Sequence, residues 1–220
     1  MSNEYLTEEE QIDAIKRWWK ENGKSIVLGL VLGIGGISGF RYWQGTVDEQ
    51  ARVASMQFDE VVTLSSDKKE TFLEKVETIQ KEHSGASYAD LSAFVAAKKL
   101  VADKDYLGAK KQLQWVVENS KFDSFVHIAR IRMVKVMIQL NEVQAGLDLI
   151  KNIDSSGFES TYAELRGDIY ALLKQNVKAK AEYQIAMNKI DAGDRRATAI
   201  EMKSNNLPAK DEPLVKTAKD

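Results

Sequence analysis

Residues 163–187 read AELRGDIYALLKQNVKAKAEYQIAM, and this stretch shows the clearest structural pattern in the chain. Apolar residues recur at helical spacing on both sides of a short polar break at Gln175 and Asn176. The pattern predicts two helices joined by a tight turn. Small and aromatic residues stand where such helices would pack closely against each other and against a neighbouring pair: Gly167, Tyr170, Ala179, Tyr183 and Ala186.

The spacing of these residues resembles that of the tetratricopeptide repeat, a helical hairpin with a period of about 34 residues. Two earlier segments fit the same frame, at Ala97, Leu100, Ala109 and Leu113 and at Met133, Val136, Ala145 and Leu149. The small residues of the second helices, Ala109, Ala145 and Ala179, are 36 and 34 residues apart. We therefore expect an all-α fold built as a tetratricopeptide-like array of helical hairpins. A helical bundle with chance spacing is the alternative.

The array is expected to cover residues 44–206. Residues 50–84 are predicted to form a degenerate helix pair that caps its beginning, because terminal repeats are often atypical. At the other end the helical pattern reaches about Ser204, with Ile200 and Met202 packing as a last cap. Residues 207–220 hold both prolines and six charged residues, which predicts a disordered tail.

Ahead of the array, residues 25–40 read SIVLGLVLGIGGISGF, 16 residues without a charge. A membrane-spanning helix needs roughly 20 residues. The flanks supply the difference, since Lys24 and Arg41 can extend to the surface and Tyr42 and Trp43 suit the interface. A buried core helix would need apolar surroundings that the chain does not offer. A cleaved signal peptide does not fit the acidic residues before the stretch and the bulky residues after it. We predict one uncleaved transmembrane helix over residues 24–43.

Basic residues beside this helix predict its orientation. Four of them precede it, Lys16, Arg17, Lys20 and Lys24, and only Arg41 and Arg52 follow closely. The positive-inside rule then places residues 1–23 in the cytoplasm and residues from 44 onward in the periplasm of a bacterium, as a single-pass type II protein of the inner membrane. Thr7 and Glu10 suit a capping box of a separate short helix before the span. A helix continuous with the span is an equal alternative.

Two sets of residues are candidates for binding. Glycines with the spacing that lets membrane helices approach closely are Gly29, Gly33, Gly35, Gly36 and Gly39. The first helix of each hairpin is expected to line a groove with Leu91, Phe94, Lys98, Val101, Arg130, Val134, Met137, Glu164 and Asp168. Phe94 and Lys98 stand where chaperone-tail-binding repeats carry a carboxylate clamp, so we expect an extended or helical peptide instead of a terminal carboxylate.

The sequence carries no signature of catalysis. It has no cysteine, two histidines and no phosphate-binding loop, HExxH or GxSxG motif. With 31 basic and 33 acidic residues, the net charge of −2 gives no sign of nucleic-acid binding. We expect no enzyme activity, metal, cofactor or small-molecule substrate, and His127 is interpreted as a satisfied or surface residue.

Residues 16–43, KRWWKENGKSIVLGLVLGIGGISGFRYW, resemble the N-terminus of the YfgM family. Trp18 and Trp19 stand where two phenylalanines are expected, a conservative departure. The resemblance implies an ancillary subunit of the SecYEG translocon with a periplasmic chaperone or adaptor role. Its implied partners are the membrane-anchored isomerase-like protein PpiD and unfolded periplasmic or outer-membrane clients. A scaffold that organises a cell-envelope complex without binding clients is the alternative.

Overall fold

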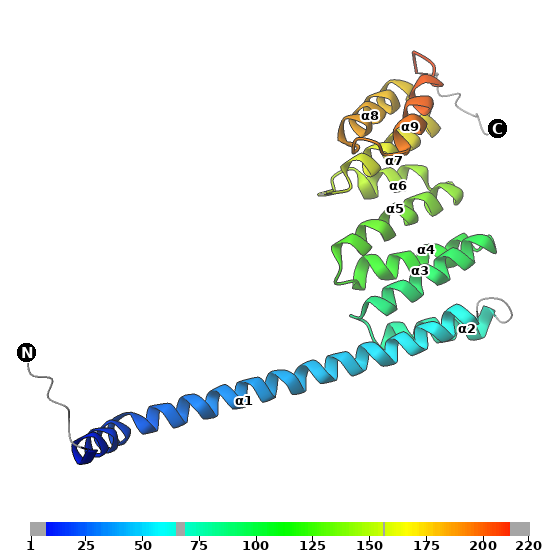
Figure 1. Cartoon of the computed structure of the whole chain (residues 1–220). Coiled ribbons are helices and arrows are strands. Elements are labelled where there is room, and N and C mark those ends of the chain that lie inside the picture. Colours follow the sequence, from blue (N-terminus) through cyan, green and yellow to red (C-terminus); the bar gives the residue numbers. More distant parts are fainter. Residues whose placement is uncertain (1–7, 65–68, 156, 212–220) are drawn as a thin grey trace, which may run out of the picture. The chain divides into compact units, whose positions relative to one another are not determined.

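The computed structural model describes residues 8–64, 69–155 and 157–211, and in these ranges every regular element is a helix (Figure 1). The chain forms two compact units, Met1–Val53 and Ala54–Asp220. The predicted all-α fold is confirmed.

The first unit consists of most of α1, Glu8–Thr63, a helix of 56 residues. Its apolar part is exposed over its whole circumference, with Leu32 67% and Ile37 64% accessible. A helix that is apolar on all sides and not covered by protein suits a lipid environment. Within the described ranges it is the one helix long and apolar enough to cross a membrane. The segment before the span belongs to the same helix, and Thr7 of the predicted capping box lies outside the described residues.

The second unit contains residues 54–63 of α1 and eight further helices among the described residues. Phe72, Val76 and Ile79 of α2 bury their side chains together with Val61 of α1, which gives the predicted cap at the beginning of the array. The helices are α2 (Lys69–Glu82), α3 (Ser87–Ala102), α4 (Tyr106–Asn119), α5 (Asp123–Gln139), α6 (Val143–Ile150), α7 (Glu159–Leu172), α8 (Asn176–Lys189) and α9 (Arg196–Asn205).

Three hairpins, α3–α4, α5–α6 and α7–α8, are closed by the same turn. Lys104, Asn141 and Lys174 each adopt a left-handed backbone, with φ of 62°, 60° and 62°. In each turn the next residue donates its N–H to the carbonyl oxygen five residues earlier, at 2.8, 2.9 and 2.9 Å. This is the Schellman ending of a helix, which satisfies carbonyl groups that the helix leaves free. The left-handed residues are 37 and 33 residues apart, so the turns mark the true repeat register.

This register corrects the sequence prediction for the second hairpin. The residue five positions after each left-handed residue is small and buried: Ala109, Gly146 and Ala179. Ala145, the predicted anchor, is exposed. A Cβ on Gly146 would lie 3.3 Å from Cγ1 of Val134, so α6 packs tightly on α5 at this glycine. The prediction was one residue out because Ala145 and Gly146 are both small and adjacent.

The end of the array differs from the prediction in one side chain. Ile200 of α9 is fully buried against α7 and α8, as expected, but Met202 is 60% exposed. Residues 207–211 contact the array: Leu207 packs on the same cluster, and Asn176 donates its side-chain N–H to the carbonyl oxygen of Lys210 at 2.8 Å. The remainder of the predicted tail lies outside the described residues.

Candidate protein-binding groove

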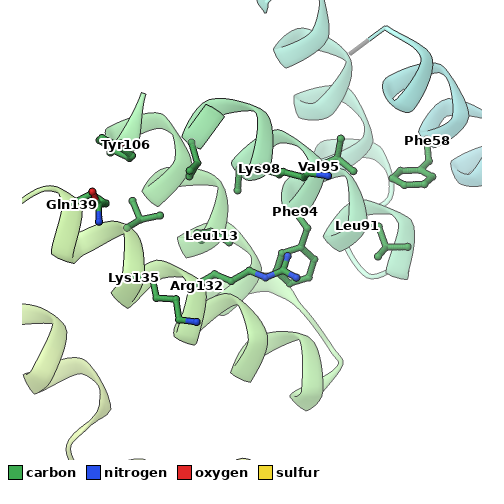
Figure 2. Close-up of a pocket in the computed structure, with 13 residues that line it drawn as sticks. Phe58, Leu91, Phe94, Val95, Lys98, Tyr106, Leu113, Arg132, Lys135 and Gln139 are labelled. Carbon is green, nitrogen blue, oxygen red and sulfur yellow. The ribbon is translucent and has the colours of Figure 1, made fainter. Parts of the chain in front are cut away.

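A groove of 790 Å³ opens between α3 and α5, the first helices of two successive hairpins (Figure 2). We call it the α3/α5 groove. Four predicted groove residues line it together: Leu91, Phe94, Lys98 and Val101. Sequence reasoning missed other residues that line it, among them Phe58, Tyr106, Arg132 and Lys135. Phe58 was missed because residues 50–84 were treated as a cap, and Lys135 because the register of α5 was displaced.

The apolar floor of the groove is held in a fixed arrangement. The rings of Phe94 and Phe125 meet edge to face with centroids 5.9 Å apart. The guanidinium carbon of Arg132 lies 4.8 Å from the centroid of Phe94. Such cation–π contacts contribute roughly 0.5–1 kcal/mol at exposed sites. The packing fixes the floor of the groove, while Leu91 and Val95 remain partly exposed.

The rim of the groove is basic. Lys98, Arg132 and Lys135 are exposed, and no acidic residue is among those that line the groove. None of the three makes an ion pair with an acidic group of the described ranges. The groove therefore offers apolar surface beside uncompensated positive charge.

Three predicted groove residues of α5 lie elsewhere, because the predicted repeat register was displaced by one residue in this helix. Val134 is 0% exposed and Met137 is 6% exposed, so both belong to the core. Val134 and Met137 lie seven and four residues before the left-handed turn residue, as Ala97 and Leu100 do in the first hairpin. Arg130 reaches Tyr162 of α7 instead of the groove, and burial raises the pKa of Tyr162 while Arg130 opposes that shift.

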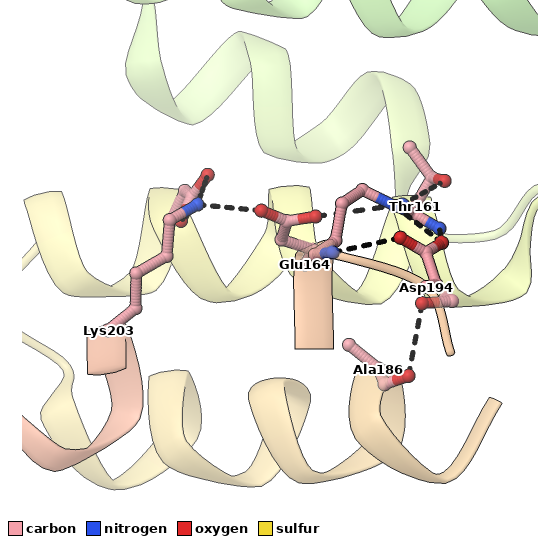
Figure 3. A network of polar contacts seen from close by, with 8 residues as sticks. Thr161, Glu164, Ala186, Asp194 and Lys203 are labelled. Carbon is pink, nitrogen blue, oxygen red and sulfur yellow. Dashed lines mark hydrogen bonds and ion pairs between the residues drawn. The ribbon is translucent and has the colours of Figure 1, made fainter. Parts of the chain in front are cut away.

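Glu164 and Asp168 lie on α7, where helix α9 pairs with both (Figure 3). Nζ of Lys203 is 2.8 Å from Oε1 of Glu164 and 2.9 Å from Oδ1 of Asp168. Burial opposes the charge of Lys203, but its hydrogen bonds to the two carboxylates outweigh burial and raise its pKa. Tyr183 also donates its hydroxyl to Asp168, at 2.8 Å. These two acids are neutralised within the chain and do not line the α3/α5 groove.

The candidate membrane-contact glycines lie on an open surface of α1. At all five, an added Cβ would meet nothing within 4 Å outside its own helix backbone: Gly29, Gly33, Gly35, Gly36 and Gly39. The structure thus leaves room for a second helix there, and the contact itself stays a prediction.

His127 is held by its neighbours on α7 and in the loop before it. Nδ1 of His127 lies 2.9 Å from the hydroxyl of Tyr162, and its ring stacks on Phe158 with centroids 4.8 Å apart, so it is a satisfied histidine. In residues 8–64, 69–155 and 157–211, no group of three or more histidine or acidic side chains is placed to hold a metal ion.

Comparison with known proteins identifies the family of the chain. The tetratricopeptide repeat-like domain family matches residues 16–209. Proteins named "Ancillary SecYEG translocon subunit" from Haemophilus influenzae and Escherichia coli are each 29% identical, over 92% of this chain and 98% of their own length. A protein of the same name from Neisseria gonorrhoeae is 25% identical over the same shares. No solved structure matches the chain.

These relatives confirm the resemblance to the YfgM family that residues 16–43 indicated. The family match covers most of the array and includes the apolar helix. The chain therefore belongs to the tetratricopeptide repeat-like domain family.

Proposed function

We propose that this protein is an ancillary subunit of the SecYEG translocon that binds translocating proteins in its α3/α5 groove. The observation that carries the proposal is the open apolar groove with a basic rim, on a chain that also has one membrane-type helix. Relatives matched over 98% of their length carry the translocon name, which supports the same partner here. The proposed action is binding and not catalysis.

The proposed topology follows from the basic residues of α1. Residues 1–23 are cytoplasmic, 24–43 span the inner membrane, and 44–206 lie in the periplasm. Lys16, Arg17, Lys20 and Lys24 support this orientation through the positive-inside rule. Protease added to spheroplasts is then expected to remove the repeats and spare the N-terminal end. Repeats that resist protease until the membrane is opened would reverse the orientation.

The proposed contact with SecYEG or PpiD uses the glycine face of α1. Membrane helices associate mainly by close packing, because lipid provides no hydrophobic drive between them. Gly29→Leu combined with Gly33→Leu should weaken co-purification of the translocon, while the repeats stay folded. Ile34→Phe enlarges the face of the same helix that lies opposite the five glycines and is the matched control. Equal loss in both variants, or in neither, would contradict a specific glycine face.

Site-specific crosslinking tests client binding. A photocrosslinking residue at Val101, which lies in the groove and is 39% exposed, should trap a secreted chain arrested during translocation. The same residue at Leu107, which is 68% exposed and outside the groove, is the control. If probes at Val101 never trap a client while probes in α1 contact the translocon, client binding fails and the protein is a scaffold.

A further inference from the structure

Equivalent positions of the three hairpins differ in charge. The residue six positions before each left-handed turn residue is Lys98 in α3, Lys135 in α5 and Asp168 in α7. These side chains belong to the first helix of each hairpin. In the array, the first helices of successive hairpins are neighbours. The turn that closes each hairpin is the same in all three, so these positions are equivalent and differ in their side chains.

In the last part of the array, the negative charge of Asp168 is paired with a basic residue of the same chain. Helix α9 follows α8 as α5 follows α4, and its Lys203 pairs with Asp168 and Glu164. Arg196 of α9 adds a second cation, 3.7 Å from Glu164. Facing helices of opposite charge thus neutralise each other at the end of the array.

Between α3 and α5 the facing charges have the same sign. Lys98 on α3 and Arg132 and Lys135 on α5 border one apolar groove without an acidic partner in the described part of the chain. Like charges beside an apolar surface repel one another, and an apolar ligand that displaced water there would strengthen the repulsion. A ligand that brings negative charge removes this penalty. The groove is therefore complementary to a ligand that is both acidic and apolar.

We infer that the α3/α5 groove recognises protein segments in which acidic side chains alternate with apolar ones. This rests on the proposed function, that the groove binds polypeptides, and adds the chemistry by which it selects among them. The apolar residues of the segment contact Leu91, Val95 and Val101, and its carboxylates pair with Lys98 and Lys135. The volume of 790 Å³ lies within the range of about 300–1,000 Å³ that is usual for sites enclosing most of a ligand.

The test uses the full chain in detergent micelles and three short fluorescein-labelled peptides. All three alternate leucine with a second residue, which is glutamate, glutamine or lysine. Fluorescence anisotropy should show the glutamate peptide binding roughly tenfold more tightly than the glutamine peptide, and the lysine peptide binding least. Raising the salt concentration should reduce this preference, because exposed ion pairs are screened.

Charge reversal separates specificity from folding. Lys98→Glu with Lys135→Glu should weaken binding of the glutamate peptide at least tenfold and strengthen binding of the lysine peptide. Lys111→Glu reverses one charge, half the change of the double variant, on the exposed side of α4 outside the groove, and should leave the order of the peptides unchanged. A gain for the lysine peptide in the double variant that is absent in Lys111→Glu would assign the effect to the groove.

The outcomes distinguish this inference from the function it rests on. If the glutamine peptide binds as tightly as the glutamate peptide, the acidic preference is overturned and client binding stands. If no peptide binds while the translocon still co-purifies, client binding itself fails. If phosphatidylglycerol in the micelles displaces the glutamate peptide from both the wild type and Lys111→Glu, the groove binds lipid headgroups and the inference is overturned.

Discussion

Replacing Gly167 by alanine tests a close contact between α7 and α8. A Cβ at this position would lie 2.6 Å from Cε1 and 2.7 Å from Cδ1 of Tyr183. Real Cβ atoms do not approach that closely, so either the ring or the backbone must move. The ring has little room, because Tyr183 is 3% exposed and packs in one cluster with Ala163, Ala179 and Ile200.

Two effects of opposite sign set the magnitude. Alanine favours a helix interior over glycine by about 1 kcal/mol. Overpacking a dense core costs about 1–3 kcal/mol. Moving the ring of Tyr183 also weakens the 2.8 Å hydrogen bond from its hydroxyl to Asp168, and bonds to charged groups contribute roughly 1.5–3 kcal/mol. We expect Gly167→Ala to lower the free energy of unfolding by about 2 kcal/mol.

The assay is urea unfolding of the full chain in micelles, followed by far-ultraviolet circular dichroism. It is repeated in a Tyr183→Leu background, because the first hairpin places Ala97 and Leu113 at the positions of Gly167 and Tyr183. The double variant thus copies a pair that already packs in this protein. There Gly167→Ala should be neutral or stabilising, by up to about 1 kcal/mol. An equal loss in both backgrounds would show that contact with the ring is not the cause.

Three further outcomes are expected. Burial raises the pKa of the Asp90 carboxyl above its ordinary value, although the hydrogen bond from Ser120 lowers it. The native state therefore holds the carboxyl proton of Asp90 more tightly than the unfolded state does. Stability of the wild type should therefore fall relative to Asp90→Asn as pH rises through the acid range, and parallel pH profiles would contradict this. Ile200→Ala should cost about 2–4 kcal/mol in thermal or urea unfolding, and Met202→Ala less than about 0.5 kcal/mol, because only Ile200 is buried. Gly146→Ala should change unfolding free energy by less than about 1 kcal/mol, since a methyl group of Val134 at 3.3 Å can yield where a ring cannot; a loss as large as that of Gly167→Ala would refute the distinction.

The sequence predicted the helices and the repeat because both depend on local signals. The polar breaks at Asp103–Asp105, Asn141 and Gln175 coincide with turns, and the small residues at 109 and 179 are buried as expected. Helix periodicity tolerates a slip of one residue, however, since neighbouring small residues satisfy the spacing almost equally well. That slip put Val134 and Met137 in the groove and left Lys135 out.

The groove itself could be predicted only in part. Leu91, Phe94, Lys98 and Val101 were found because they share one helix, where spacing fixes a face. Arg132 and Phe58 were not found, because their place in the groove depends on how separate helices stack. The pairing of Lys203 with Glu164 and Asp168 was missed for the same reason, since it links α7 to α9 across 35 and more residues.

The two charge clusters differ in whether their charges are paired within the described chain. Asp168 receives hydrogen bonds from Lys203 and Tyr183, so its charge is part of the packing that holds α9 on the last hairpin. Lys98 and Lys135 hold nothing in place within the described residues, and their charge is available to a partner. A repeat array normally exposes a continuous face to its ligands. Here α9 neutralises the acidic residues of the last segment of that face, while the basic rim of the α3/α5 groove stays unpaired within the described residues.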